Sequence, residues 1–92
     1  IVGGVIMAKV ECIGHFEGQT QINNESYFII EADDDNGSYK GKPLQFLVNS
    51  EEYPSLQGFK RCDTLSLEGD IVSQSHEGLF LDNIEWRDFD NE

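Results

Sequence analysis

The amino-acid sequence predicts a single all-β domain whose strands close into a barrel. Apolar and polar residues alternate with a period of two in several separate segments, which is typical of strands with one buried face. Only residues 50–62 offer a helix, and Pro54 and Gly58 interrupt that segment. With 92 residues the chain has the length of one small domain. Closing the sheet would remove the unpaired edges that an open sheet exposes.

The first strand is predicted over residues 6–16, where apolar or small residues occupy the even positions. These are Ile6, Ala8, Val10, Cys12, Gly14 and Phe16. The run is long, and Gly14 within it predicts a bulge or bend that lets one strand serve two parts of a curled sheet. Residues 19–26 are polar and have no periodicity, so they are predicted to form a loop.

The second and third strands are predicted to form a hairpin. Residues 27–32 are aromatic and β-branched, and the turn-forming cluster 33–38 follows them. After Pro43, apolar residues alternate again over residues 44–49. The acidic run Asp33-Asp34-Asp35 would therefore lie at the tip of the hairpin.

The second half of the chain predicts one short helix and two more strands. In residues 50–62, one or two helical turns would face Tyr53 and Leu56 toward the core. Alternation resumes over residues 63–72, with a bend at Gly69, and residues 73–78 form a hairpin turn before a strand over residues 79–86. The predicted domain thus spans residues 7–87 and is followed by an acidic tail, residues 88–92.

The order is long strand, strand, strand, short helical connection, strand and strand, which is the order of an OB-fold barrel. The sharper motifs lie in the second half: Phe46-Leu47-Val48, Gly58-Phe59-Lys60-Arg61, Asp63-Thr64-Leu65-Ser66-Leu67-Glu68-Gly69 and Leu81-Asp82-Asn83-Ile84-Glu85. In these motifs the chain resembles the bacterial single-stranded-DNA-binding protein family and its relative, primosomal replication protein B, most closely over residues 58–85. Cys62 stands where this family commonly has Gly.

The resemblance implies a small single-stranded-DNA-binding or replication-accessory protein. An OB-fold binds single strands by stacking bases on aromatic side chains and drawing phosphates into a basic groove. The residues expected to form this surface are Tyr27, Tyr39, Lys40, Lys42, Lys60, Arg61 and Trp86. The alternative for the aromatic residues is plain packing in the core or at the rim of the barrel.

The charge of the chain favours a second hypothesis. The chain contains six Lys and Arg residues and eighteen Asp and Glu residues, which gives a formal net charge of -12. This balance excludes a general basic surface for nucleic acid or anionic membrane. The alternative function is an acidic protein-interaction module, or a mimic of nucleic acid, that docks on a basic partner. Its surface would comprise Asp33, Asp34, Asp35, Asp88, Phe89 and Asp90.

The sequence offers no constellation for catalysis or for a cofactor. His15 and His76 lie on different predicted elements without a carboxylate or Cys at zinc spacing, and residues 31–42 depart from the calcium-loop pattern. We therefore expect no catalytic residue, no metal and no cofactor. A homodimer through the edge of the long first strand is a further expectation.

The N-terminal residues and the cysteines point to a cytoplasmic protein. Residues 1–6, before Met7, are expected to be an expression remnant or a short extension, since they lack the features of a signal peptide. The longest uncharged apolar stretch, residues 1–8, is far shorter than a membrane span. Cys12 and Cys62 are not expected to form a disulfide.

Overall fold

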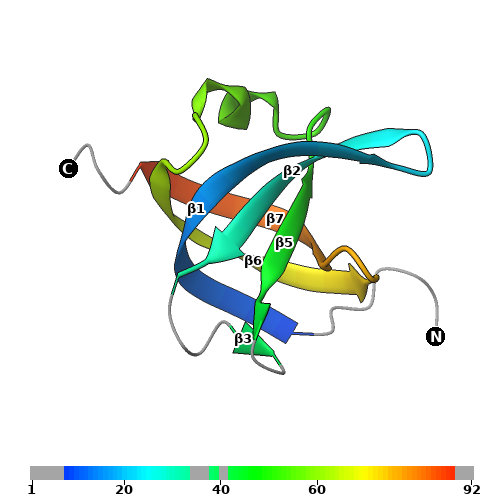
Figure 1. Cartoon of the computed structure of the whole chain (residues 1–92), viewed down its shortest axis with the longest axis horizontal. Helices are drawn as coiled ribbons and strands as arrows, with labels where there is room; N and C mark the ends of the chain where they lie inside the picture. Colours follow the sequence, from blue (N-terminus) through cyan, green and yellow to red (C-terminus); the bar gives the residue numbers. More distant parts are fainter. Residues whose placement is uncertain (1–7, 34–37, 40–41, 89–92) are drawn as a thin grey trace.

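The computed structural model describes residues 8–33, 38–39 and 42–88, with the backbone alone at residues 38–39 and 42–43. Strands dominate this part of the chain (Figure 1). The elements are β1 (Ala8–Ile22), β2 (Glu25–Ala32), β3 (Ser38–Tyr39), β4 (Lys42–Pro43), β5 (Gln45–Asn49), the 3-10 helix η2 (Pro54–Gly58), β6 (Thr64–Gln74) and β7 (Leu79–Asp88). The predicted all-β class is therefore confirmed. The predicted expression remnant or extension, residues 1–6, lies outside the described residues.

Five of the strands form a closed sheet in the order β1-β2-β5-β7-β6, with β6 pairing back to β1. The pairing of β5 with β7 is parallel, and the other four pairings in this sheet are antiparallel. The predicted hairpin of the second and third strands is present as β2 and β5. Within its connection, β3 and β4 form a separate two-stranded sheet.

Strand β1 is long because it belongs to two parts of the sheet. Residues 8–15 pair with β6, residues 14–22 pair with β2, and Gly14 therefore pairs on both sides. A Cβ atom on Gly14 would lie 2.6 Å from the carbonyl oxygen of Glu31, so only glycine permits this close approach. The register shift itself lies beyond Gly14, between Phe16 and Gly18, where Glu17 is the extra residue of a β-bulge.

The prediction of a loop over residues 19–26 was wrong. Strand β1 continues to Ile22, and a two-residue turn leads directly into β2. The turn residues Asn23 and Asn24 have φ angles of 53° and 69°, the left-handed pair that a tight hairpin turn requires. This hairpin projects from the rest of the sheet (Figure 1), so both of its faces reach solvent and its sequence lacks apolar alternation.

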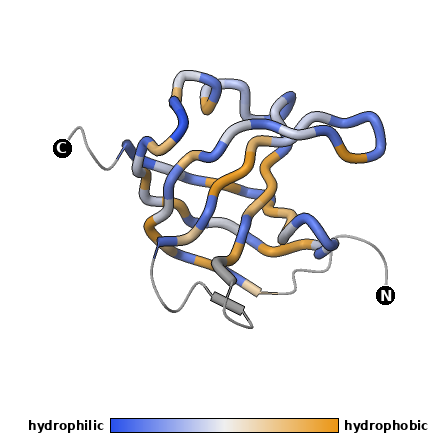
Figure 2. Tube along the Cα trace, viewed as in Figure 1, coloured by the Kyte–Doolittle hydropathy of each residue, from blue (hydrophilic) through white to orange (hydrophobic). Residues whose placement is uncertain are grey.

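The core fills the inside of the closed sheet with side chains from each of its five strands. Figure 2 shows hydrophobic residues concentrated along these strands. The core residues are Phe16, Phe28, Ile30, Ala32, Phe46, Val48, Leu56, Leu65, Leu67, Leu81 and Ile84. The ring centroid of Phe16 lies 5.6 Å from that of Phe28 and 6.2 Å from that of Phe59. Leu56 of η2 is fully buried, which anchors the connection between β5 and β6 to the core.

The structure also bears on the cysteines and on membrane-spanning helices. Cys12, packed against the core, and the exposed Cys62 do not form a disulfide. In the part of the chain that the structure describes, no helix has both the length and the apolar character to span a membrane.

Candidate functional site

The strand register aligns outward-facing side chains in rows across β1, β2, β5 and β7. Successive side chains of a strand point to opposite faces, so the neighbours of the core residues Phe28 and Ile30 point outward. One row is polar and comprises His15, Glu31 and Gln45. The next row is apolar and comprises Ile29, Leu47 and Phe80, of which Leu47 is fully buried. A third row comprises Thr20, Tyr27 and Asn49. We call this surface the outer face.

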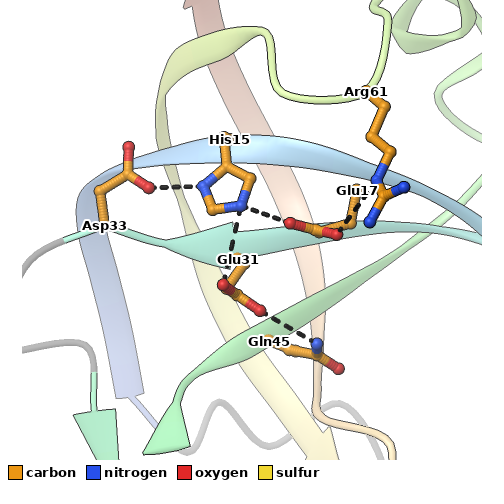
Figure 3. Close-up of polar contacts among 6 residues, drawn as sticks. All are labelled: His15, Glu17, Glu31, Asp33, Gln45 and Arg61. Atoms are coloured by element: carbon orange, nitrogen blue, oxygen red, sulfur yellow. Dashed lines mark hydrogen bonds and ion pairs between the residues drawn. The ribbon is translucent and has the colours of Figure 1, made fainter.

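The polar row is the centre of a group of ionisable side chains, the His15 cluster, formed by His15, Glu17, Glu31 and Asp33 (Figure 3). His15 Nδ1 lies 2.5 Å from Asp33 Oδ1. His15 Nε2 contacts Glu17 Oε2 and lies 3.6 Å from Glu31 Oε1. One imidazole thus faces three carboxylates.

Two neighbours hold the outer atoms of this cluster. Gln45 Nε2 donates a hydrogen bond to Glu31 Oε2 at 3.3 Å. Arg61 Nε lies 3.8 Å from Glu17 Oε1. The side chains of His15, Glu17 and Glu31 are each about three-quarters buried, with 23 %, 23 % and 24 % of their surface exposed.

The carboxylates determine the protonation of the histidine. The hydrogen bond to Asp33 raises the pKa of His15 most, and the hydrogen bond to Glu17 raises it further, whereas partial burial acts in the opposite direction. The net effect is a pKa of His15 above its ordinary value of 6.5. The imidazole therefore keeps its proton at a higher pH than a solvated histidine does.

The sequence analysis missed this cluster, although part of it was visible. His15 and Glu17 are two positions apart in a strand, a spacing that puts both side chains on one face. Glu31 joins them only because β2 pairs with β1 in the register His15 with Glu31. That register depends on the β-bulge at Glu17 and on the tight hairpin turn, which the sequence analysis did not predict.

A second feature of the outer face is a groove of about 380 Å³ beside β2 and β7, which we call the aromatic groove. The rings of Tyr27 and Phe80 meet edge to face in its wall, with centroids 5.1 Å apart. Three carboxylates also line it, those of Glu25, Glu52 and Asp82. Among the described residues that line the groove there is no Lys or Arg.

The structure distributes the predicted nucleic-acid-binding residues over separate places. Tyr27 lines the aromatic groove, whereas Trp86 is half-buried against the core, with its ring 6.0 Å from and edge-on to that of Tyr53. Lys60 and Arg61 are exposed in the connection from η2 to β6. Tyr39 and Lys42 belong to β3 and β4, where only the backbone is described, and Lys40 lies outside the described residues.

The residues predicted to bind a basic partner are only partly described. Asp33 is exposed and contacts His15, and Asp88 is exposed at the end of β7. Asp34, Asp35, Phe89 and Asp90 lie outside the described residues. The carboxylates of the aromatic groove were not predicted, since Glu25, Glu52 and Asp82 are far apart in the sequence and only the pairing of β2, β5 and β7 brings their elements together.

Comparisons of the chain with protein-family models, with curated proteins and with solved structures found no significant match.

Proposed function

We propose that this chain is an OB-fold protein-interaction module that binds a cationic segment of a partner protein in the aromatic groove. The observation that carries this proposal is the Tyr27–Phe80 ring pair, which lies in one wall with carboxylates and without a described Lys or Arg. An aromatic surface ringed by negative charge complements a Lys- or Arg-containing peptide.

The path of the chain around the closed sheet supports the OB-fold assignment. If β1, β2, β5, β6 and β7 are counted as strands one to five, their order around the sheet is one, two, three, five, four. Strands three and five are the parallel pair, as the OB-fold requires. Ligands of OB-folds bind on the face of strands two and three, which here are β2 and β5. Tyr27 and Asn49 of the aromatic groove lie on these two strands.

The charges favour a cationic protein segment over nucleic acid. Neutralising the phosphates of a single strand requires Lys or Arg. Two of these residues already have acidic partners: Lys9 Nζ lies 3.2 Å from Asp70 Oδ1, and Arg61 Nε lies 3.8 Å from Glu17 Oε1. A net charge of -12 also speeds the encounter with a basic partner. At the groove, a Lys or Arg side chain would gain both a ring face and a nearby carboxylate.

Single-stranded DNA is the second candidate ligand. It is favoured by the position of the Tyr27 and Phe80 rings on the face that OB-folds use for stacking bases. Its phosphates would then have to avoid Glu25, Glu52 and Asp82. Neutralising the groove carboxylates would strengthen DNA binding and weaken peptide binding, so the two ligands respond to the same variant in opposite directions.

The test is fluorescence anisotropy of a labelled lysine-rich peptide and of labelled oligo-dT, each at low and at physiological salt. In the double variant E25Q/E52Q, the peptide should bind about fivefold more weakly. The matched control is E68Q/E85Q, which removes the same charge from an exposed cross-strand pair of β6 and β7. If both double variants lost the same peptide affinity, the effect would come from the net charge of the chain and not from the groove. That result would overturn the proposed site. If Y27L abolished oligo-dT binding and E25Q/E52Q strengthened it, single-stranded DNA would be the ligand of the groove instead of the peptide.

A further inference from the structure

We propose that His15, Glu17 and Glu31 bind one divalent transition-metal cation, with Zn²⁺ as the probe of choice. His15 and Glu17 come from β1, and Glu31 comes from the neighbouring position of β2 (Figure 3). This site shares no side chain with the aromatic groove. It therefore does not depend on the proposed function.

The distances fit a metal without rearrangement of the strands. One ligand atom from each of the three residues lies within 4.8 Å of the others. His15 Nε2 and Glu31 Oε1 are 3.6 Å apart, close to the separation of about 3.4 Å between two ligands of a tetrahedral Zn²⁺. Glu17 Oε2 contacts His15 Nε2 directly. A cation would lie between these two atoms, with a small withdrawal of the Glu17 side chain.

Each proposed ligand offers one atom to the centre, and its other polar atom lies next to a group outside the centre. Asp33 contacts His15 Nδ1, which leaves Nε2 facing the centre. In the same way, Gln45 donates to Oε2 of Glu31 and leaves Oε1 inward. Metal sites in proteins typically have such outer partners, because they fix the orientation and the tautomer of the ligands.

Arg61 is the outer neighbour of Glu17, at an ion-pair distance of 3.8 Å and with a side chain that is 77 % exposed. It lies beside Oε1 of Glu17, so Oε2 remains directed at His15. Each of the three ligands thus has one outer neighbour. These neighbours, Asp33, Gln45 and Arg61, come from three separate segments of the chain. The β-bulge at Glu17 is also of the kind that re-aims a side chain at functional sites.

The charge of the cluster favours a cation. Glu17, Glu31 and Asp33 carry three negative charges, and a protonated His15 together with Arg61 balances only two of them. The ligand side chains are about three-quarters buried, so solvent screens this excess less than at an open surface. One imidazole and two carboxylates suit Zn²⁺ and its first-row neighbours better than Mg²⁺ or Ca²⁺, which prefer oxygen ligands alone.

The test is isothermal titration of the full chain, freed of metal with a chelator, with Zn²⁺. We expect one equivalent of Zn²⁺ and a thermal unfolding midpoint that rises on binding. The ligand variants H15N, E17Q and E31Q should each weaken binding by about tenfold or more. The variant D33N should weaken it about tenfold through the orientation of His15. Circular dichroism establishes that each variant is folded.

Three controls separate this site from adventitious binding. H76N removes the other histidine, which is exposed in the turn before β7. C62S removes the exposed thiol, and E68Q/E85Q removes an equal number of exposed carboxylates. All three should retain wild-type affinity. Zn²⁺ binding that survives H15N and E17Q unchanged, or that H76N or C62S abolishes, would overturn the proposal, as would no measurable binding to the wild-type chain.

Discussion

The side-chain amide of Asn83 donates a hydrogen bond to Oδ2 of Asp70 at a distance of 2.9 Å. Asp70 is 4 % exposed, and its other oxygen, Oδ1, receives a hydrogen bond from Lys9 at 3.2 Å. Asn83 itself has a φ of 53°, in the left-handed region, close to a register shift between β6 and β7. Asn83 therefore serves both as a backbone bend in β7 and as a partner of a buried carboxylate.

These two roles of Asn83 can be separated by two substitutions. N83G keeps a residue that tolerates the left-handed conformation and removes only the amide, whereas N83A removes the amide and also strains the backbone. We expect N83A to lower the free energy of unfolding by about 1 kcal/mol more than N83G does. Urea denaturation followed by circular dichroism measures the difference. Equal losses in the two variants would show that the φ of Asn83 imposes no strain.

The same hydrogen bond predicts an acid-dependent stability. The hydrogen bond from Asn83, followed by that from Lys9, holds the pKa of Asp70 below its ordinary value of 3.8. A carboxyl with a lower pKa in the folded state stabilises the fold above its unfolded pKa, and this contribution is lost as the pH falls through the folded value. Urea denaturation between pH 2 and 6 should therefore show a steeper loss in the wild type than in D70N. E77Q, which changes an exposed turn residue, is the control, and a D70N curve parallel to the wild type would contradict the prediction.

His15 predicts a dependence in the opposite direction. Its pKa is raised in the folded state, first by the hydrogen bond to Asp33, so protonation favours the fold. The contribution is complete below the unfolded value of 6.5 and is lost as the pH rises through the folded pKa. In the presence of a chelator, nuclear magnetic resonance titration of the His15 ring should give a midpoint above 6.5. D33N should lower that midpoint, and a D33N midpoint equal to that of the wild type would remove Asp33 as the cause.

The sequence pattern was enough to predict the five strands of the closed sheet, but neither the short pair β3 and β4 nor where each strand ends. The core residues Leu65 and Leu67 of β6 alternate, whereas Leu81 and Ile84 of β7 are three positions apart because the bend at Asn83 lies between them. Both strands and the turn between them nevertheless lie close to their predicted places. The β1–β2 hairpin was not predicted because its polar residues reach solvent on both faces. Its sequence therefore lacks the apolar alternation that identifies a strand. The dipeptide Asn23-Asn24 was the available signal, since both positions of such a turn require positive φ.

The candidate sites were less predictable than the fold because they depend on contacts between strands. Tyr27 was expected on the binding face, but its partner Phe80 comes from β7, whose position beside β5 is set by a parallel pairing. The sequence analysis expected no metal site at His15, because the register between its strand and the strand of Glu31 was unknown. A one-residue change of register would have placed Ile30 or Ala32 opposite His15 instead.

Cys62 lies in the turn between η2 and β6. Cys62 is exposed and has a φ of 77°, which costs a residue with a Cβ about 1–2 kcal/mol. The backbone around it is fixed, because the Cys62 amide donates to the carbonyl oxygen of Phe16 at 2.7 Å and the Asp63 amide donates to that of Lys60 at 2.9 Å. Replacement by glycine relieves the strain but adds freedom to the unfolded chain.

The balance should favour C62G, which we expect to raise the free energy of unfolding by about 0.5–1 kcal/mol. C62A is the matched control, since it removes the thiol but keeps the Cβ and the strain. Both variants are compared with the wild type by urea denaturation in a reducing buffer, so that thiol oxidation does not contribute. Stabilisation in C62A as large as that in C62G would assign the effect to the thiol. The C62G and C62A variants keep the backbone hydrogen bonds of the turn and the bond from the Lys60 amide to Oδ2 of Asp63. A gain confined to C62G would therefore place the strain in the φ of residue 62.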